Sequence, residues 1–545
     1  MSERKPLVFK IANEDWEFEA IHHLNYKTFV EEIPQHAPSP AQRLVDKFHL
    51  ENIYLTCFSG RKLVGMLAVR GKRPFSLDGK LENLDSHLPP GRKICEIRLL
   101  AIEKRYRGLR GGQVLAGILA LLWQHGVERG YDLAVISGTT RQEKLYRHLG
   151  FIPFGPLVGT GGAMFQPMYV TLETFESAAR EFVRVSPTRA FQPVAANFLP
   201  GPVAIHRIVK RAFEQTPESH RGDAFVQDFQ AVRQALCQLT HSTRAEILLG
   251  SGSLANDAVA AQLSLERGRG LLLINGEFGE RLADHARRMN LEFDTLSVPW
   301  GEAFDAEAVR ARAAGSRPAW LWCAHCETST GVLNDLDALK EVCAPRGIKL
   351  CLDAISSIGT VPVDLRGVHL ASCVSGKGLR SYPGLALVFY HHAITANPHL
   401  PRYVDLGYYA QHQGIAFTHS SNLVHALHAS LKRADWVKHY SDVAEMSAGL
   451  RAKARDSGFK LIEADGNISP AIITIALPAE LDSAKIGGQL QEAGYLLSYN
   501  SEYLRRKNWI QICLMGEIAR EKLVSLINAL RRVCFRHKQA EHAAV

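Results

Sequence analysis

Apolar residues occur in short runs along the second half of the chain, separated by longer stretches that mix polar and apolar positions. Between residues 244 and 391 the runs include AEILL, GLLLI, WLWCA, KLCLD and LALVFY. Short apolar strands that alternate with helices are typical of a mostly parallel sheet covered on both faces. The pattern therefore predicts an α/β fold for this part of the chain.

Changes in the pattern mark the expected domains. FKLIEADG, PAIITIALP, NWIQICLMG and a final helix predict a small α+β domain over 456–535, followed by a tail over 536–545. The stretch 186–203 carries four prolines and no clear periodicity, and we expect a linker over 186–197. We expect the large α/β domain to occupy 198–455 and a separate domain to occupy 1–185.

The first 185 residues carry their own alternation of strands and helices. ICEIRLLAI (94–102) is predicted to be a strand, RYRGLRGG a basic glycine-rich turn, and the apolar-striped segment after it a long helix. DLAVIS (132–137) is a second strand, and a helix ending in YRHLGF follows.

Composition and charge narrow the range of functions. Of the 545 residues, 46% are apolar and 22% are charged, as in a soluble globular protein. The net charge of +9 is dispersed, which suits anionic small molecules or an acidic carrier protein. The sequence contains no motif of the kind that contacts bases in the grooves of nucleic acids, so we expect no nucleic-acid partner.

The N-terminus has no apolar core of signal-peptide length. The longest nearly apolar run, VLAGILALLW (114–123), is far shorter than the roughly 20 residues that span a bilayer. The ten cysteines are scattered, and several lie in strand-like runs, which is typical of reduced thiols. We expect a cytoplasmic protein with no membrane span.

Three short motifs lie where apolar strands end. GSGS (250–253) would present N–H groups at a helix start, an arrangement that binds phosphate, although such turns are common. Asp353 could cap a turn or pair with a buried cation. Lys377 lies among small residues in SGKG, where a lysine is either solvated or has the lowered pKa of a Schiff-base lysine.

Together with NGEFGER, HCETSTGVLN and QGIAFTHSS, these motifs resemble class-V, fold type I aminotransferases that use pyridoxal phosphate (PLP). The segment from about 198 to 519 looks most like the 2-aminoethylphosphonate–pyruvate, serine–pyruvate and alanine–glyoxylate transaminases. The resemblance implies a mostly parallel seven-stranded sheet, an amino donor, a keto acceptor, and a homodimer formed through the PLP domain.

The resemblance also implies roles for individual residues. Lys377 would hold PLP covalently and move a proton between the substrate Cα and the cofactor C4′, and Asp353 would pair with the pyridinium nitrogen. Phe278 would stack on the ring, and Thr328 would lie near the phenolate oxygen. The phosphate would be bound by Ser251, Gly252, Ser253 and Ser375, and by Thr418 reaching in from the other subunit.

Cys323 and Cys326 form a C-x-x-C with His325 between them, which raises the question of a zinc half-site or a redox pair. A zinc site as a rule needs four ligands, and the sequence offers no second pair at a suitable spacing. Residues from His325 to Gly331 match the loop beside the cofactor in the resembled family. We therefore expect no metal and a coincidental C-x-x-C, with a redox pair as the lesser alternative.

One position departs from the resembled family. The family's arginine for the substrate carboxylate lies in a strand of the form R-I-G-x-x-G, and here Gln511 occupies its place. A neutral amide cannot replace a bidentate guanidinium at equal strength. Either another cation, such as Arg380, Arg505 or Arg506, binds the carboxylate, or the substrate is not a simple α-amino acid and α-keto acid pair.

The basic turn of the first domain would cradle a pyrophosphate, with charge added by Arg105, Arg107 and Arg110, unless it is a plain surface turn. The order strand, turn, helix, strand and YxxLGF resembles the GNAT acyltransferase superfamily, in its N-acyl amino acid synthase and autoinducer-synthase-like branch. That resemblance implies that acyl-CoA or an acyl-carrier protein is bound by Arg107, Arg110, Gly111 and Gly112. Arg110 stands where the family's turn has its first glycine.

The same resemblance implies the residues of acyl transfer. Tyr146 matches a tyrosine that protonates the departing thiolate, and Arg98 matches a basic residue of the synthase-like branch. Glu96, on the strand before the turn, is a candidate base for the incoming ammonium. An exposed strand glutamate without a catalytic role is the equal alternative.

From these resemblances we expect a bifunctional enzyme of specialised metabolism. A PLP-dependent aminotransferase for an amino acid or aminophosphonate-like substrate would be fused to an N-acyltransferase that acylates an amine. The alternative is a PLP-dependent lyase or decarboxylase, suggested by Gln511, with a non-catalytic acyl-binding module, suggested by Arg110.

Overall fold

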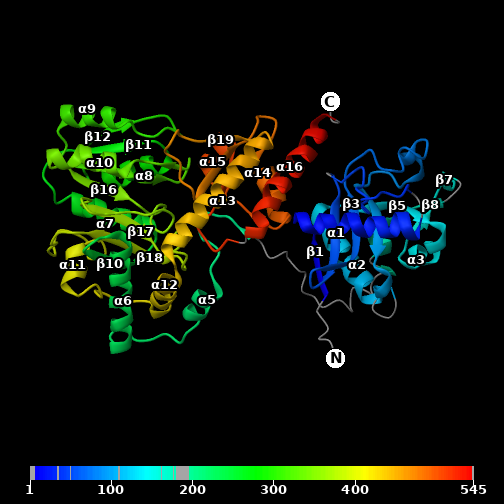
Figure 1. Ribbon diagram of the computed structural model, residues 1–545, viewed down its shortest axis with the longest axis horizontal. Helices are drawn as coiled ribbons and strands as arrows, with labels where there is room; N and C mark the ends of the chain where they lie inside the picture. Colours follow the sequence, from blue (N-terminus) through cyan, green and yellow to red (C-terminus); the bar gives the residue numbers. More distant parts are fainter. Residues whose placement is uncertain are drawn as a thin grey trace. The chain divides into compact units, whose positions relative to one another are not determined.

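The computed structural model describes residues 7–33, 36–49, 51–107, 111–160, 163–175, 177–178, 196–518 and 520–542. The chain forms two compact units, whose elements are labelled in Figure 1. The first contains the described residues up to 178, Glu492–Gly494 and the end of the chain from Val524; the second contains Ala196–Gln491 and Tyr495–Leu523. Arg110, most of the expected linker 186–197, the expected boundary at 185 and the end of the expected tail lie outside the described residues.

A seven-stranded sheet forms the centre of the second unit, in the order β10-β18-β17-β16-β13-β11-β12. Every neighbouring pair is parallel except the two that include β18. The mostly parallel sheet predicted from the sequence is confirmed. Its strands are β10 (Arg244–Gly250), β11 (Gly270–Ile274), β12 (Phe293–Ser297), β13 (Trp320–Ala324), β16 (Lys349–Asp353), β17 (Leu370–Val374) and β18 (Gly384–Tyr390).

Helices cover both faces of this sheet because successive strand residues point to opposite sides. Leu321 and Leu352 pack in the core on one face, and Trp322 and Cys351 pack in the core on the other. The first core is closed by α6 (Asp223–Thr240), α9 (Ala306–Ser316), α10 (Leu336–Cys343) and α12 (Ser421–Arg433). The second is closed by α7 (Gly252–Leu263), α8 (Glu277–Arg288) and α11 (Leu406–Gln411).

The second unit ends in a smaller α+β part. Its three-stranded antiparallel sheet contains β19 (Lys460–Ile462), β20 (Ile472–Ala476) and β22 (Trp509–Cys513). Its helices are α13 (Trp436–Asp456), α14 (Ser483–Glu492) and α15 (Glu502–Lys507). Two short ladders join distant segments: β14 (Cys326–Glu327) pairs with β15 (Val332–Leu333), and β9 (Ala196–Asn197) pairs with β21 (Tyr495–Leu496). The helix α5 (Arg207–Phe213) lies between β9 and α6 in the chain.

The first unit is built on an eight-stranded sheet in the order β1-β2-β3-β4-β5-β8-β6, with β7 paired to β8. The helices α1 (Asp15–Tyr26) and α2 (Gly111–Arg129) pack in separate apolar cores, of which the α2 core also contains strand residues of β2, β4 and β5. The strand and helix predicted around the basic turn are confirmed as β4 and α2. The strands are β1 (Leu7–Ile11), β2 (Ile53–Ser59), β3 (Lys62–Arg70), β4 (Ile94–Ile102), β5 (Leu133–Thr139), β6 (Ile152–Pro153), β7 (Val158–Thr160) and β8 (Ala163–Thr171). Two further helices are α3 (Glu143–His148) and α16 (Arg520–His542), of which α16 belongs to this unit from Val524 onward.

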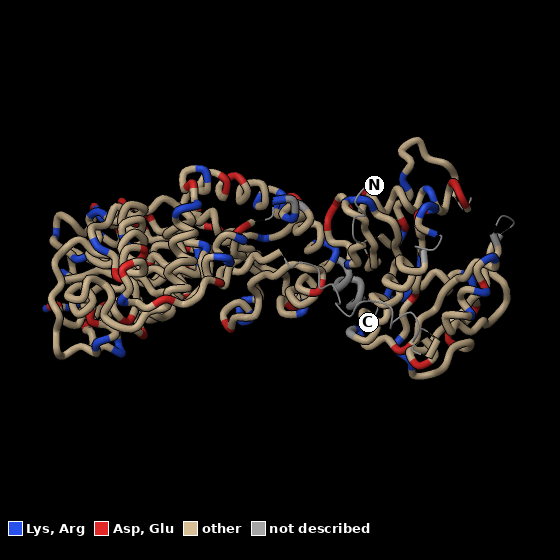
Figure 2. Tube along the Cα trace, turned by 90° about the horizontal axis from the view of Figure 1, so that it is seen from below, with Lys and Arg blue, Asp and Glu red and all other residues tan. Residues whose placement is uncertain are grey.

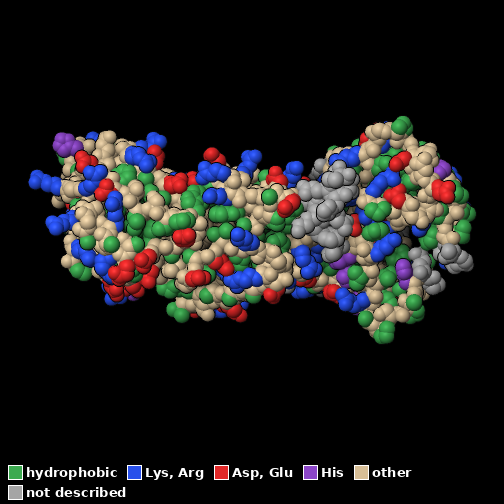
Figure 3. Space-filling view, turned by 90° about the horizontal axis from the view of Figure 1, so that it is seen from above, with side chains coloured by type: hydrophobic (Ala, Val, Ile, Leu, Met, Phe, Trp, Pro, Cys, Tyr) green, Lys and Arg blue, Asp and Glu red, His purple; other side chains and the backbone are tan. Residues whose placement is uncertain are grey.

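Charges of both signs are interspersed along the trace in Figure 2 and on the face seen in Figure 3. The excess of Lys and Arg over Asp and Glu is therefore not gathered into one patch in these views. None of the helices in the described part of the chain combines the length and the apolar character needed to cross a bilayer.

Candidate active sites

The residues expected to hold a cofactor lie at the carboxyl ends of neighbouring parallel strands. Asp353 is the last residue of β16, Lys377 follows β17, and Phe278 lies in the first turn of α8, after β11. Neighbouring parallel strands end at the same edge of a sheet, which is where ligands bind in open α/β folds. This topology brings together side chains that are far apart in the sequence.

The Lys377 amine lies beside two hydroxyls and an aromatic ring. Its Nζ donates to Ser356 Oγ at 2.9 Å, and Ser356 Oγ lies 2.5 Å from Thr328 Oγ1. The same Nζ is 5.3 Å from the centroid of the Phe278 ring. Burial lowers the pKa of Lys377, while the charge of Asp353 acts in the opposite direction. The amine is thus closer to its neutral, nucleophilic form than a solvated lysine.

The Asp353 carboxylate is buried and held from two sides. Asn256 Nδ2 donates to its Oδ2 at 2.9 Å, and the backbone N–H of Ile355 donates to its Oδ1 at 3.0 Å. Ser372 Oγ in turn donates to Asn256 Oδ1 at 2.6 Å. Burial raises the pKa of Asp353, and the hydrogen bond from Asn256 opposes this rise. A carboxylate in this setting favours a cationic partner, which would stabilise its charged form.

The helix α7 begins at the expected phosphate position. Ser251 is its N-cap residue, and the side chains of Ser251 and Ser253 are exposed. A Cβ at Gly252 would lie 2.7 Å from Ile355 Cδ1, so this first turn approaches the segment after Asp353 closely. The first N–H groups of a helix have no partner within the helix, and they attract anions.

Two other expected phosphate ligands are placed differently. Ser375 is buried, and its hydroxyl donates to the Tyr382 carbonyl at 2.6 Å while accepting from Leu385 N at 3.3 Å. That hydroxyl stabilises the turn after Lys377, and its hydrogen is not directed at a phosphate. Thr418 is exposed on the segment between α11 and α12.

Glu327 is a buried residue of this site to which the sequence assigned no role. Its carboxylate accepts hydrogen bonds from the backbone N–H groups of Phe278, Gly279 and Ser329, and from Ser329 Oγ. Burial raises the pKa of Glu327, and these hydrogen bonds oppose the rise. The side chain therefore ties the start of α8, which carries Phe278, to the loop that carries Thr328. A carboxylate three positions beyond an apolar strand was the signal available in the sequence.

Gln511 and Arg380, the candidates for substrate binding, make contacts within the protein. Gln511 is fully buried, and its Nε2 donates to Thr328 O at 2.8 Å, Ser329 O at 3.1 Å and Thr474 Oγ1 at 2.9 Å. These contacts leave neither amide hydrogen for a substrate. The Arg380 guanidinium lies over the Trp436 ring at 5.4 Å, and burial lowers its pKa.

The C-x-x-C cysteines are free, buried thiols in β13 and β14. Burial raises the pKa of Cys326 to about 12, so this thiol is neutral and a poor nucleophile. His325 Nδ1 lies 3.0 Å from Ser357 Oγ, and burial lowers the pKa of His325 to about 4. Among the residues that the structure describes, no group of three or more His, Cys, Asp and Glu side chains is arranged to hold a metal ion.

The first unit contains a large cavity between α2, β4 and α3. Its volume is about 1570 Å³. One part of the lining is apolar and includes Leu115, Leu119, Leu122, Leu145 and Leu149; the other part is polar and includes Asp46, Ser76, Lys80, Glu96 and Arg98. Tyr146 also lines the cavity, and burial raises its pKa. An apolar chain and a polar head group could therefore occupy the same space.

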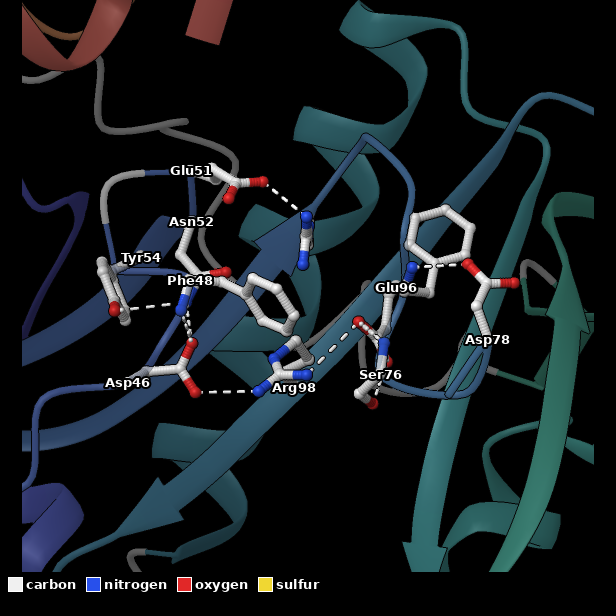
Figure 4. A network of polar contacts seen from close by, with 11 residues as sticks. Asp46, Phe48, Glu51, Asn52, Tyr54, Ser76, Asp78, Glu96 and Arg98 are labelled. Atoms are coloured by element: carbon white, nitrogen blue, oxygen red, sulfur yellow. Dashed lines mark hydrogen bonds and ion pairs between the residues drawn. The ribbon is translucent and has the colours of Figure 1, made fainter. Parts of the chain in front are cut away.

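Glu96 and Arg98 belong to a network of charges at the polar end (Figure 4). They lie two positions apart on β4 and so share a face of the strand. Glu96 Oε1 accepts from the backbone N–H of Ser76 at 2.9 Å, and Arg98 pairs with Asp46 Oδ2 at 2.8 Å and with Glu96 Oε2 at 3.4 Å. Glu96 is fully buried, so the alternative of an exposed strand glutamate is wrong.

The residues expected at the acyl donor's pyrophosphate are only partly described. Gly111 begins α2, and Gly112 lines the cavity. Arg107 also lines the cavity, but its Nε donates to Ile102 O at 2.6 Å and its NH1 pairs with Glu32 at 2.6 Å. Arg110 lies outside the described residues.

Two family models match separate parts of the chain. Residues 20–168 match the family described as N-acyl amino acid synthase FeeM, and residues 211–400 match aminotransferase class-V. The first match includes Glu96, Arg98 and Tyr146, and the second includes Asp353 and Lys377.

Individual relatives resemble the second part. The protein named soluble hydrogenase, small subunit, of a Synechococcus species is 28% identical over 363 residues, which are 63% of this chain and 93% of the relative. A 2-aminoethylphosphonate–pyruvate transaminase of Pseudomonas fluorescens is 34% identical over 210 residues, 36% of this chain and 56% of the transaminase. The match thus spans little more than half of that transaminase. The crystal structure of an alanine–glyoxylate aminotransferase from a Nostoc species superposes with a TM-score of 0.58 at 28% identity, over 64% of this chain and 98% of that one.

A class-V aminotransferase fold implies PLP, and the residues present fit this cofactor. A lysine with a lowered pKa, a buried carboxylate, an aromatic ring and a helix N-terminus lie together at one edge of the sheet. They match the aldehyde, the pyridinium nitrogen, the ring and the phosphate of PLP.

The first domain and the second thus belong to different families of transferase. The chain is an enzyme that joins an N-acyl amino acid synthase domain of the FeeM family to a class-V aminotransferase domain of fold type I.

Proposed function

We propose that the chain is a bifunctional enzyme in which a PLP-dependent aminotransferase acts on an amino acid or aminophosphonate-like substrate, and an N-acyltransferase acylates an amine. The observation that carries this proposal is the placement of Lys377, Asp353 and Phe278 at one edge of the parallel sheet. The presence of both domains in one chain supports a shared pathway, in which the amine made at one site is acylated at the other.

In the aminotransferase site each residue has a separate task. Bound PLP supplies the electron sink that makes a proton on the amino-bearing carbon acidic. Lys377, whose amine is already biased toward the neutral form, accepts and returns that proton. Ser356 orients the amine, Asp353 provides the negative charge opposite the pyridinium nitrogen, and the first turn of α7 provides N–H groups for the phosphate.

In the acyltransferase site the cavity holds the donor's acyl chain against its apolar lining and the amine at its polar end. This domain resembles the GNAT superfamily, in which the amine attacks the thioester carbonyl directly. Glu96 removes the proton that the ammonium must lose, and Tyr146 protonates the departing thiolate of acyl-CoA or an acyl-carrier protein. The raised pKa of Tyr146 keeps it protonated at neutral pH.

We further propose a cytoplasmic homodimer joined through the aminotransferase domain, in which the exposed Thr418 reaches the cofactor phosphate of the other subunit. Arg107, Gly111 and Gly112 remain the proposed seat of the acyl donor's pyrophosphate. Arg110 belongs to the same proposal.

The test is optical. Purified enzyme loaded with PLP is mixed with single amino donors, including 2-aminoethylphosphonate, alanine and serine, and the visible absorbance of the lysine-bound cofactor is followed. Stoichiometric loss of that absorbance, restored by a keto acid, identifies a transaminase and its donor, which is then offered to the acyltransferase domain with acyl-CoA. Product formation without a keto acid would contradict transamination. It would favour a lyase or decarboxylase, the function to which the neutral Gln511 points.

A further inference from the structure

The second unit contains a cavity whose described lining includes none of the residues assigned to the cofactor. Its volume is about 810 Å³, which is within the range of small-molecule sites. Its lining comes from α6, α10, α12 and α13 and from the segments 333–335, 362–364 and 466–467. Neither Lys377 nor Asp353 belongs to this lining. A ligand bound here would therefore be separate from a molecule that reacts at Lys377.

The ring of His325 presents an unused acceptor to this cavity. The residue lines the cavity and is 5% exposed. Ser357 Oγ donates to Ala354 O at 3.2 Å, so it accepts the hydrogen of His325 Nδ1, which lies 3.0 Å away. Burial lowers the pKa of His325 to about 4, and the neutral ring then carries its one hydrogen on Nδ1. Nε2 is left as a lone-pair acceptor without a partner among the described residues.

Backbone hydrogen bonds fix the position of this ring. His325 N donates to Asp353 O at 2.9 Å, and Asn334 N donates to His325 O at 2.8 Å. Asn334 Nδ2 also donates to Ala324 O at 2.8 Å. Asp335, which follows Asn334 in the chain, lines the same cavity. An acceptor nitrogen and a carboxylate are thus held at the cavity before a ligand binds, which lowers the cost of ordering them.

The charged groups of the lining favour a cation. Asp335 Oδ1 accepts from Asp337 N and Ala338 N at the start of α10, while its Oδ2 has no partner in the described part of the chain. Lys340 is the only lysine or arginine of the described lining, and its Nζ is held by Asp337 at 3.3 Å and by the carbonyl of Asp364 at 2.8 Å. An ammonium ion could pair with Asp335, whereas an anion finds no unengaged lysine or arginine in this lining.

The lining also offers aromatic and apolar side chains. Trp436 and Tyr440 on α13, whose ring centroids lie 6.0 Å apart, both line the cavity. The Arg380 guanidinium, which lies over the Trp436 ring at 5.4 Å, is not part of the described lining. The apolar residues of the lining include Leu239, Leu333, Pro362, Val363 and Leu431. Such a surface favours an aromatic body through the exclusion of water, and aromatic faces attract an ammonium ion.

We propose that this cavity is a second ligand site of the second unit and binds a protonated amine with an aromatic body that carries a further N–H or O–H donor. The ammonium ion pairs with Asp335, the further donor bonds to His325 Nε2, and the aromatic body packs against Trp436 and Tyr440. The site goes beyond the proposed reactions, because its ligand is bound without reaching Lys377.

The test measures binding to the PLP-loaded enzyme by isothermal titration calorimetry. The probe is 3-(dimethylaminomethyl)indole, a tertiary amine with an indole N–H. A tertiary amine cannot condense with an aldehyde, so its heat of binding does not come from a reaction with PLP. Two comparison ligands are the N-methylindole analogue of the probe, which lacks the donor for His325, and indole-3-acetate, which carries the opposite charge.

Three variants locate the binding. Asp335→Asn removes the charge and keeps the helix cap, because Asn and Asp cap helices about equally well. Asp305→Asn is the matched control, since Asp305 caps α9 in the same way, accepting from Glu307 N and Ala308 N, and lies outside the described lining. Ala235→Trp places a bulky side chain at a position on α6 that lines the cavity.

We expect the probe to bind wild-type enzyme and Asp305→Asn with the same dissociation constant. Asp335→Asn should raise that constant about fivefold, because a partly exposed ion pair is lost, and the N-methylindole analogue should bind wild-type enzyme more weakly by about the same factor. Indole-3-acetate with wild-type enzyme, and the probe with Ala235→Trp, should give no heat of binding.

Four results would overturn the proposal: no binding of the probe to wild-type enzyme, binding of indole-3-acetate as tight as that of the probe, an unchanged constant in Asp335→Asn, or equal affinity for the N-methylindole analogue. None of these measurements depends on transamination or acyl transfer. The second ligand site and the proposed function can therefore fail separately.

Discussion

Asn256 donates a hydrogen bond of 2.9 Å to Asp353, from a position 97 residues earlier in the chain. Asn256 lies on the buried side of α7, among alanines and a valine, and Ser372 on β17 fixes the other end of its amide. The Asp353 carboxylate is therefore held in position by residues of two neighbouring elements, α7 and β17, before a cofactor binds.

The substitution Asn256→Ala should weaken PLP binding. Removing the amide leaves a buried carboxylate with one partner fewer, and hydrogen bonds to charged groups contribute about 1.5–3 kcal/mol. We expect the dissociation constant of PLP to rise about tenfold or more, measured by titrating cofactor-free protein and following absorbance. Asn275→Ala is the control, because Asn275 is equally buried in the same unit but bonds to Asn334 and Glu302. Equal losses in both variants would show a general packing effect.

Lys377 should remain reactive at a lower pH than an exposed lysine. Its pKa is lowered by burial from the usual 10.5, and an amine loses its nucleophilicity as the pH falls through its pKa. Cofactor-free protein is labelled with an amine-acylating reagent over a range of pH, and peptides containing Lys377 and Lys438 are quantified by mass spectrometry. Lys438, whose side chain is 68% exposed, is the internal comparison. Parallel loss of labelling at the two lysines would contradict the lowered pKa.

The substitution Glu327→Ala should destabilise the second unit. It leaves the N–H groups of Phe278, Gly279 and Ser329 without their buried acceptor. We expect the free energy of unfolding to fall by about 2 kcal/mol or more, measured by denaturant titration. Because α8 carries Phe278, the circular dichroism of bound PLP should change as well. Glu307→Ala, at an exposed position of α9, should leave both readouts as in wild type.

The substitution Tyr146→Phe should slow acyl transfer and leave the aminotransferase reaction unchanged. A positioned general acid contributes about 100-fold or more to a rate, so release of free thiol from acyl-CoA should slow by on the order of 100-fold. Thiol release is followed with a chromogenic disulfide. Tyr169→Phe is the matched control, since Tyr169 lies on β8 and packs against Phe154. An undiminished rate in Tyr146→Phe would remove the proposed proton donor.

Much of the fold of the second unit could be predicted because each strand of its large sheet is marked by a short run of neighbouring apolar residues. Each apolar run that the sequence offered, from AEILL to LALVFY, is a strand of the seven-stranded sheet. Parallel strands that are buried on both faces need continuous apolar runs, and such runs can be recognised in the sequence. Asp353 ends such a run and Lys377 follows the strand β17, so their meeting at one edge could also be expected.

What the sequence could not predict depends on contacts between distant segments. The pairing of β9 with β21 joins two dipeptides that have no strand pattern of their own. The burial of Glu96 depends on the segment around Ser76, which folds over β4 and supplies two hydrogen-bond donors. The use of the Ser375 hydroxyl within its own turn depends on the position of Tyr382. Spacing alone does not indicate any of these contacts.

The hydrogen bonds of Gln511 also restrict the motion of a loop. Its amide attaches β22 to the carbonyls of the loop that carries Thr328, and Thr474 on β20 donates to Thr330 O of the same loop at 2.8 Å. The loop cannot open without breaking bonds to two strands of the neighbouring sheet. Amide hydrogens of β20, β22 and this loop should therefore exchange with solvent in one cooperative event, and the loop beside Ser356 and Lys377 is rigid before any ligand binds.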